Sequence, residues 1–219
     1  MKNPSGTRAR VLGAEPRAVL FDLLTALLDS AALWDAVAGG AEKGRPWRET
    51  YLRNTYSEGA YRPYEQLVRE AACEVGLPEI VADRLVGRYQ ELVPWPEVNE
   101  VLGALARRVP LGVVTNCSET LGHVAVNRIG VAFDVVVTAE RAGYYKPHPQ
   151  PYRLALEALG ETAEAVLFVA GSTYDLFGAT AIGMSVFWHN RLHMSAPPGA
   201  PTPLAHHENL YPLLQSGIR

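Results

Sequence analysis

Four polar features occur at or after the ends of short apolar runs, in an order that could build a hydrolytic site. They are Asp22, the pair Thr115–Asn116, Lys146, and Asp175 shortly after Ala170–Ser172. A carboxylate at a strand end can attack carbon or phosphorus and form a covalent ester. A neighbouring lysine can keep that carboxylate ionised, and a second carboxylate can hold the lysine or the water of a later hydrolysis. Hydroxyl and amide groups, such as those of Thr115–Asn116, can bind a substrate oxyanion. Together the four features predict covalent catalysis by Asp22.

Each feature alone is a weak signal. An aspartate that ends a strand is usually a turn or cap residue, Lys-Pro is usually an exposed loop, and Thr-Asn is an ordinary turn pair. The prediction depends on all four occurring in order, each at or after the end of a buried run. Glu97 and Asp134 belong to no such pattern and are expected to be helix caps or surface residues.

The apolar runs have the composition of strands that are buried on both faces of a parallel sheet. The five predicted strands are Ala18–Asp22, Leu111–Thr115, Val135–Val137, Ala165–Ala170 and Met184–Trp188. Helix-like stretches separate them, at Glu97–Arg108, Ser118–Gly130, Pro151–Leu159 and Asp175–Gly183. This alternation predicts an α/β fold with a Rossmann-like parallel sheet, whose active site lies at the carboxyl ends of the strands.

Residues 30–94 interrupt the alternation, because they contain no convincing strand. They predict helices at Ala31–Ala41, Arg48–Tyr56, Pro63–Val75 and Glu79–Val93. Pro46 is expected near a helix boundary. We therefore expect a core domain formed by residues 1–29 and 95–219, with a small all-helical cap (residues 30–94) inserted after the first strand.

The composition indicates a soluble cytoplasmic protein. Of the 219 residues 48% are hydrophobic, which is enough for a packed core, and the net charge of −3 favours neither nucleic acid nor a membrane as partner. Met1–Arg17 lacks the apolar region of a signal peptide and is expected to be a loose leader. Cys73 and Cys117 are expected to be free thiols rather than zinc ligands. The Pro-rich segment Ala196–Pro203 is expected to be a surface loop or the approach to a short final helix.

The four polar features fall at the four motif positions of the haloacid dehalogenase superfamily. These positions are Asp22, Thr115, Lys146 and Asp175, and the resemblance extends from Val19 to Arg191. The resemblance implies that superfamily's α/β core, with Asp22 as the nucleophile. The helical segment then resembles the superfamily's small cap, which follows the first motif.

Two positions argue against the phosphatases of this superfamily. Those enzymes carry a second aspartate two residues after the nucleophile as general acid, but here that residue is Leu24, which cannot transfer a proton. Their fourth motif has a Gly-Asp pair whose acid binds Mg²⁺, but here the pair is Ala170–Gly171 and the later Asp175 remains. Both departures fit the branch that displaces a leaving group from carbon, the 2-haloacid dehalogenases, and imply that no metal or other cofactor is needed.

Further residues resemble the dehalogenase branch. Trp47–Arg48 is expected to open a cap helix and resembles the family's Trp-Arg pair, whose arginine faces the leaving halide. Leu52, Tyr152 and Tyr174 match an apolar, a tyrosine and an aromatic position of the family's site, and Phe187–Arg191 resembles its strand with an Asn-Arg ending. Structural interpretations stay open, since Trp47 and Leu52 could be cap core, Arg48 an exposed charge and Tyr152 a packing residue.

The sequence departs from the family around the pocket. Thr25 stands one residue earlier than the family's threonine, Leu24 replaces a tyrosine, and Ser172 stands at the position of an asparagine. Glu49 follows the arginine at the position of an amide. A carboxylate there would repel a halide but favour a cation, which keeps open the ring opening of azetidine-2-carboxylate, where a ring nitrogen departs.

We therefore predict SN2 attack by Asp22 on C2 of a small 2-substituted carboxylic acid, most simply an (S)-2-haloacid, to give a 2-hydroxy acid. Thr115–Asn116 and nearby backbone N–H groups bind the substrate carboxylate, and Arg48 acts on the leaving-group side. Water then hydrolyses the aspartyl ester, positioned by Asp175 and Lys146. The residues expected to line the substrate site are Leu24, Thr25, Glu49, Leu52, Tyr152, Ser172 and Tyr174.

Two other classes stay open. The chain could be a phosphatase that binds Mg²⁺ with Asp22 and Asp175, or an inactive core that serves as a binding module. The favoured interpretation expects a small carboxylic acid as the partner, without metal, nucleic acid or membrane. A homodimer stays open.

Overall fold

The computed structural model describes residues 15–215. Residues 1–14 of the expected leader, and residues 216–219, lie outside the described residues. The described strands form one parallel sheet in the order β3-β2-β1-β4-β5-β6. Their bounds are β1 Ala18–Phe21, β2 Leu111–Thr115, β3 Val135–Thr138, β4 Val166–Ala170, β5 Ser185–His189 and β6 Ala205–His207. The prediction of an α/β fold with a Rossmann-like parallel sheet is confirmed.

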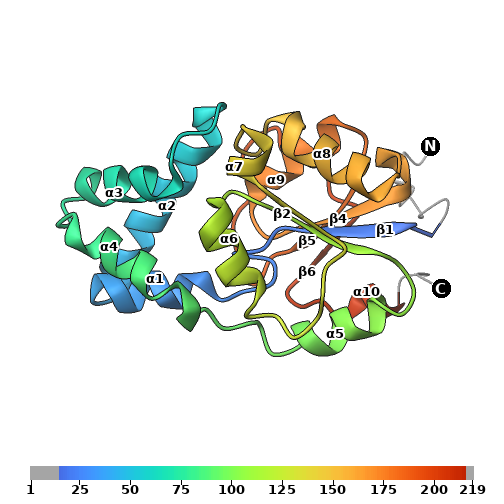
Figure 1. The fold of residues 1–219 in the computed structure, drawn as a ribbon, viewed down its shortest axis with the longest axis horizontal. Coiled ribbons are helices and arrows are strands. Elements are labelled where there is room, and N and C mark those ends of the chain that lie inside the picture. Colours follow the sequence, from blue (N-terminus) through green and yellow to red (C-terminus); the bar gives the residue numbers. More distant parts are fainter. Residues whose placement is uncertain (1–14, 216–219) are drawn as a thin grey trace, which may run out of the picture.

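Helices cover both faces of this sheet (Figure 1). One face carries α7 (Ala139–Ala142), α8 (Pro149–Leu159) and α9 (Thr173–Ala181), and the other carries α5 (Val98–Leu105), α6 (Glu119–Val126) and α10 (Pro212–Gln215). Successive residues of β1 point to opposite faces, so Leu20 packs beneath α8 and α9 while Val19 and Phe21 pack on the other side. Burial on both faces explains why β1 has an uninterrupted apolar sequence.

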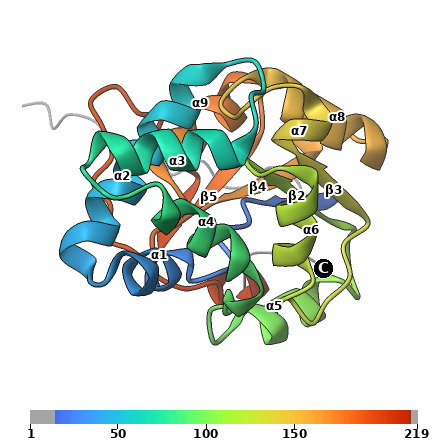
Figure 2. The same ribbon diagram turned by 60° about the vertical axis from the view of Figure 1, so that its left-hand side comes forward.

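The helices of the cap gather at one side of the sheet, as Figures 1 and 2 show from two directions. They are α1 (Ser30–Ala38), α2 (Ala41–Glu58), α3 (Tyr64–Glu74), α4 (Ile80–Gly87) and the 3-10 helix η1 (Tyr89–Glu91). The entry and exit of the segment run side by side, with an antiparallel bridge between Leu28 and Pro94. This arrangement supports an insert after β1, while its bounds as a separate domain stay a prediction. In the part of the chain that the structure describes, no helix has the length and apolar content needed to span a membrane.

The prediction that Trp47–Arg48 opens a helix is wrong. The helix α2 begins at Ala41, so the pair lies inside it, as does Pro46. A proline has no N–H to donate to the carbonyl four residues earlier, which for Pro46 is the carbonyl of Glu42. Glu42 is exposed in the first turn of α2, so water can donate to its carbonyl instead. Gly44 permits close packing of this early part of α2, since a Cβ there would lie 2.5 Å from a backbone atom of α1.

Two further segments differ from their predictions. The single helix expected over Glu79–Val93 is instead α4 followed by η1. The Pro-rich segment leads into β6, an edge strand that the sequence does not predict, before the short final helix α10. The three residues of β6 are half-buried or exposed and include two histidines, so the strand lacks the apolar run that identifies the others.

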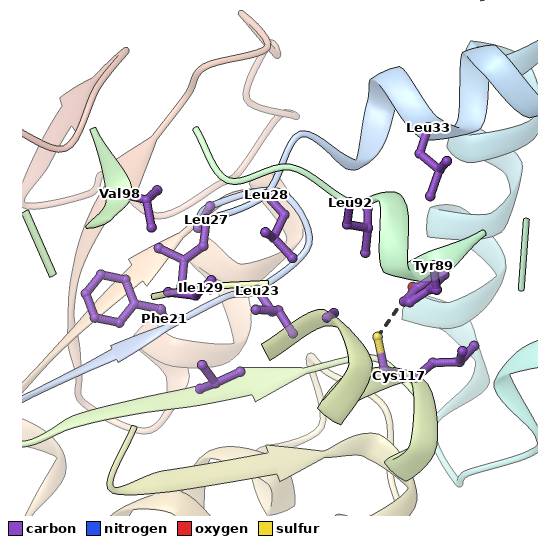
Figure 3. Packing of buried hydrophobic residues seen from close by; sticks show 14 of the residues in the cluster. Phe21, Leu23, Leu27, Leu28, Leu33, Tyr89, Leu92, Val98, Cys117 and Ile129 are labelled. Atoms are coloured by element: carbon purple, nitrogen blue, oxygen red, sulfur yellow. Dashed lines mark hydrogen bonds between the residues drawn. The ribbon is translucent and has the colours of Figure 1, made fainter. Parts of the chain in front are cut away.

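A single hydrophobic cluster joins the sheet to the cap (Figure 3). It contains Phe21 of β1, Leu27 and Leu28 of the loop that follows, and Leu33 and Tyr89 of the cap. The loop after β1 is therefore packed between both parts of the molecule. This loop begins at the aspartate that ends the first strand.

Candidate active site

Asp22, Lys146 and Asp175 meet at the carboxyl end of the sheet. Asp22 follows β1 directly, and Asp175 lies in the first turn of α9, which follows the neighbouring strand β4. The Nζ atom of Lys146 lies 2.9 Å from Asp22 Oδ1 and 2.9 Å from Asp175 Oδ1. All three side chains are buried. The parallel sheet thus assembles three of the four predicted motif residues into one ion-paired group.

Burial and charge set the protonation of this group. Burial alone would lower the pKa of Lys146, but the carboxylates of Asp175 and Asp22 raise it above its ordinary value. Burial raises the pKa of Asp175 to about 6, and the charge of Asp22 acts in the same direction while Lys146 opposes it. Lys146 is therefore a cation at neutral pH, and Asp175 takes up a proton in mildly acidic solution.

The second oxygen of Asp22 is enclosed by backbone. The N–H groups of Thr25 and Ala26 donate to Oδ2 at 3.1 and 3.2 Å. Gly171 lies against the same atom, since a Cβ there would lie 2.7 Å from Oδ2 and 2.3 Å from the nitrogen of Ala26. Oδ2 has no room for an incoming carbon atom on these sides, whereas Oδ1 faces Lys146. The arrangement favours Oδ1 as the attacking oxygen.

Hydroxyl groups surround the carboxylate of Asp175. Tyr152 and Tyr56 donate to Oδ1 at 3.2 and 3.4 Å, and Ser172 donates to Oδ2 at 3.4 Å. Burial raises the pKa of both tyrosines well above the ordinary range, and the charge of Asp175 adds to the shift, so both stay protonated. Tyr174 stacks on Tyr56 with ring centroids 4.4 Å apart. Three predicted substrate-site residues, Tyr152, Ser172 and Tyr174, therefore lie around Asp175.

Tyr56 is a member of this group that the sequence interpretation missed. It comes from α2 and also lies 3.0 Å from Ser172 through the two hydroxyl oxygens. Arg48, Leu52 and Tyr56 follow one another at intervals of four residues, so they lie along one side of the helix. The spacing that connects the first two residues would also have pointed to Tyr56.

Arg48 reaches the loop after β1 from the cap. Its Nη2 donates to Thr25 Oγ1 at 2.9 Å, and burial lowers its pKa while the charge of Asp22 opposes that shift. The alternative of an exposed charge is wrong, because Arg48 is buried. Arg48, Glu49 and Leu52 line a cavity of about 390 Å³ between α1, α2 and the loop after β5. Glu49 is exposed at this cavity and Leu52 is half-buried.

The residues that end β2 are engaged within the protein. The amide of Asn116 donates to the carbonyl oxygen of Lys146 at 3.1 Å and accepts from its backbone N–H at 2.7 Å. Thr115 Oγ1 donates to the sulfur of Cys117 at 3.4 Å. Asn116 thus holds the backbone of Lys146, while direct contact of Thr115 and Asn116 with a substrate stays a prediction. On the loop after β1, Leu24 is half-buried and packs on the hydrophobic cluster.

Residues near the site also have structural roles. Glu97 was expected to be a cap or surface residue, and it does occupy the N-cap position of α5, but its side chain is buried and accepts from Arg191 at 2.5 Å. Asp134 accepts a backbone N–H at the start of β2. Trp47 is buried and donates to the carbonyl of Val68, which agrees with its interpretation as cap core.

Comparisons with known proteins identify the family to which this fold belongs. The family model described as haloacid dehalogenase-like hydrolase matches residues 16–183, which include Asp22, Lys146 and Asp175. Haloacetate dehalogenase H-2 of Moraxella sp. (strain B) is 32% identical over 80% of this chain and 85% of its own length. The (S)-2-haloacid dehalogenase of Xanthobacter autotrophicus is 29% identical, over 82% of this chain and 77% of its own length.

Solved structures give the same result. An L-2-haloacid dehalogenase with 28% identity superposes with a TM-score of 0.79, covering 92% of this chain and 98% of its own. The L-2-haloacid dehalogenase of Xanthobacter autotrophicus, at 24% identity, shares the fold with a TM-score of 0.78 and covers 93% of this chain and 100% of its own. The chain is a hydrolase and belongs to the haloacid dehalogenase-like hydrolase family.

Proposed function

We propose that the protein hydrolyses the carbon–halogen bond of a small (S)-2-haloacid through an ester of Asp22, giving a 2-hydroxy acid. The observation that carries this proposal is the environment of Asp22. Its Oδ1 faces Lys146 and its Oδ2 is enclosed by backbone, while Leu24 and Gly171 stand where a phosphatase of this family would place acids. Relatives that are (S)-2-haloacid dehalogenases support the substrate class.

In the first step Asp22 Oδ1 attacks C2 of the substrate. A bond forms between Oδ1 and C2, the carbon–halogen bond breaks, and the halide leaves with the electron pair while C2 inverts. Arg48 is buried and bonded to the loop after β1, so its charge can stabilise the departing halide in a region of low dielectric. We propose that backbone N–H groups near Thr115–Asn116 bind the substrate carboxylate.

In the second step water hydrolyses the aspartyl ester. Water attacks Cγ of Asp22, negative charge forms on Oδ2, and the bond between Cγ and Oδ1 then breaks so that Oδ1 leaves with the product. The N–H groups of Thr25 and Ala26 already donate to Oδ2 and can stabilise this oxyanion. Asp175 and Lys146 position the water, whose proton passes to the product hydroxyl.

We propose that neither step needs a metal ion. An aspartate at position 171 would not fit, because even a Cβ would lie 2.3 Å from the nitrogen of Ala26. Turnover of a 2-haloacid should therefore be unchanged by a chelator. A strict Mg²⁺ requirement with p-nitrophenyl phosphate would establish the phosphatase instead.

The comparisons do not favour ring opening of azetidine-2-carboxylate. Glu49, on which that alternative depends, is exposed at the cavity beside Arg48. We propose a cytoplasmic enzyme with a small carboxylic acid as its partner, and a homodimer stays open. Release of amine from azetidine-2-carboxylate without halide release from 2-haloacids would overturn the proposal.

A single turnover in ¹⁸O-labelled water tests the covalent route. With enzyme in excess over 2-chloropropionate, the label should appear first in the peptide that contains Asp22, as read by mass spectrometry. Label in the product of the first turnover would contradict the ester. The Asp22→Asn variant is the control and should release no halide.

A further inference from the structure

Trp95 lies on the segment by which the chain leaves the cap and contacts the loop that follows Asp22. Its Nε1–H donates to the carbonyl oxygen of Thr25 at 3.0 Å. The N–H of the same peptide group, which belongs to Ala26, donates to Asp22 Oδ2 at 3.2 Å. One peptide group therefore connects the indole of Trp95 to the enclosed oxygen of Asp22.

We propose that Trp95 is a positioning residue for ester hydrolysis, acting through the Thr25–Ala26 peptide group on the oxyanion that forms at Asp22 Oδ2. The inference rests on the proposed two-step reaction. A donor at the carbonyl end of a peptide group polarises that group, which strengthens the hydrogen bond made by its N–H. Trp95 therefore strengthens one of the two donors to Oδ2.

The surroundings of Trp95 hold it in place. The guanidinium of Arg191 lies over the indole, 5.0 Å from the ring centroid, and is paired with the buried Glu97. A cation over the ring is attracted to its π electrons and draws electron density from the indole, which makes Nε1–H a better donor. The backbone N–H of Trp95 also donates to Leu27 at 3.0 Å, so ring and backbone both attach to the loop after β1.

His189 secures the next carbonyl of the same loop. Its Nδ1 lies 2.8 Å from the carbonyl oxygen of Ala26 and, because a carbonyl can only accept, carries the proton of this bond. His189 is fully buried at the end of β5. Trp95 and His189 thus hold two successive carbonyls of this loop, and the first of them, that of Thr25, shares its peptide group with an N–H that donates to Asp22.

The two chemical steps should respond differently to loss of the indole N–H. During attack on C2 the carboxylate of Asp22 loses negative charge, so a stronger donor at Oδ2 does not help. During hydrolysis Oδ2 gains negative charge, and the donor stabilises the transition state. Loss of the Trp95 N–H should therefore slow hydrolysis and leave alkylation unchanged or slightly faster. A residue with only a structural role would not separate the two steps.

The test compares Trp95→Phe with Trp188→Phe in single turnovers of 2-bromopropionate, with alkylated enzyme followed by mass spectrometry after rapid quenching. Trp188 is a matched control, because its Nε1 is buried and has no hydrogen-bond partner among the described residues. We expect hydrolysis in Trp95→Phe to be roughly two- to fivefold slower, because the Ala26 donor to the oxyanion is weakened but not lost, with accumulation of alkylated enzyme. Trp188→Phe should behave as wild type. Equal slowing of both steps, or no change in hydrolysis, would overturn the inference.

A second measurement keeps this test separate from the proposed function. No bromide release by the wild type, or ¹⁸O in the product of its first turnover, would refute the proposed function. The amide proton of Ala26, observed by NMR, reports its hydrogen bond to Asp22 even without turnover. It should shift upfield in Trp95→Phe and stay in place in Trp188→Phe, and an unchanged resonance in both variants would overturn the link through the peptide group. Should Trp95→Phe not fold, Trp95→Tyr removes the same N–H and should give the same shift.

Discussion

The ionisation of the Asp175 side chain should determine how kcat/KM falls at acidic pH. This side chain must be ionised to pair with Lys146, and burial raises its pKa to about 6. An acid is ionised above its pKa, so kcat/KM should be level at neutral pH and fall as the pH drops through about 6. Halide release measured over this range checks the prediction. A profile that stays level well below this pH would show that Asp175 need not be ionised.

The hydroxyl of Tyr152 should control the position of this acid limb. It donates to Asp175 Oδ1, and a donor favours the ionised carboxylate. Tyr152→Phe should therefore move the acid limb of kcat/KM to higher pH by roughly half a unit to one unit. Tyr211→Phe removes a hydroxyl that bonds to the distant Glu100 and serves as the control. A limb that moves to lower pH, or equally in both variants, would contradict this role.

Single residues also show how far sequence alone could go. Asp22, Lys146 and Asp175 could be predicted as a group, because each comes after a strand of the sheet. The carboxyl ends of parallel strands lie at the same edge of a sheet. The pairing of the Asn116 amide with Lys146 could not be predicted, because the amide bonds to the backbone N–H and carbonyl of Lys146, groups that do not depend on residue type. Tyr56 could have been predicted from its spacing on α2.

At the scale of elements, the contact between α1 and α2 depends on Gly44. A Cβ there would lie 2.5 Å from Cα of Asp35 and 2.8 Å from its nitrogen, so backbone must move. Gly44→Ala should lower the free energy of unfolding by about 1–3 kcal/mol. The matched change is Gly103→Ala in α5, where no heavy atom lies within 4 Å of the new Cβ. Alanine there should raise stability by up to about 1 kcal/mol through helix propensity.

Urea unfolding of both variants measures these changes. Stabilisation by both substitutions would show that α1 and α2 separate easily, which would contradict the close contact at Gly44. Destabilisation by both substitutions would mean that steric room for a Cβ atom does not decide where these two helices require glycine.

The elements differ in how clearly the sequence reveals them. Strands β1, β2 and β4 are buried throughout, and their continuous apolar runs identify them. The edge strand β6 has no such run, so its pairing with β5 cannot be inferred from composition. The start of α2 was missed because Pro46 normally marks a boundary, whereas here it lies within the early turns of the helix.

At the scale of the whole molecule, the cap is bonded to the core at several points around the site. Tyr51 Oη donates to the carbonyl of Asn116 at 3.0 Å, and Ser118 Oγ donates to Glu65 at 2.6 Å. On another side, Tyr145 Oη donates to the carbonyl of Arg62 at 2.8 Å. The hydrophobic cluster of Figure 3 also continues from β1 into the cap. Cap and core therefore share polar contacts and an apolar interior.

This shared interior predicts that cap and core unfold together. Neither part can open without exposing apolar side chains of the other, so urea should produce one cooperative transition. Fluorescence in a Trp95→Phe/Trp188→Phe background reports Trp34 and Trp47, both buried in the cap, whereas far-ultraviolet circular dichroism reports the whole chain. The two midpoints should coincide. Tyr51→Phe, which removes one bond between the parts, should lower both midpoints equally, by the equivalent of about 1 kcal/mol. A fluorescence transition at lower urea than the circular dichroism transition would show that the cap unfolds independently.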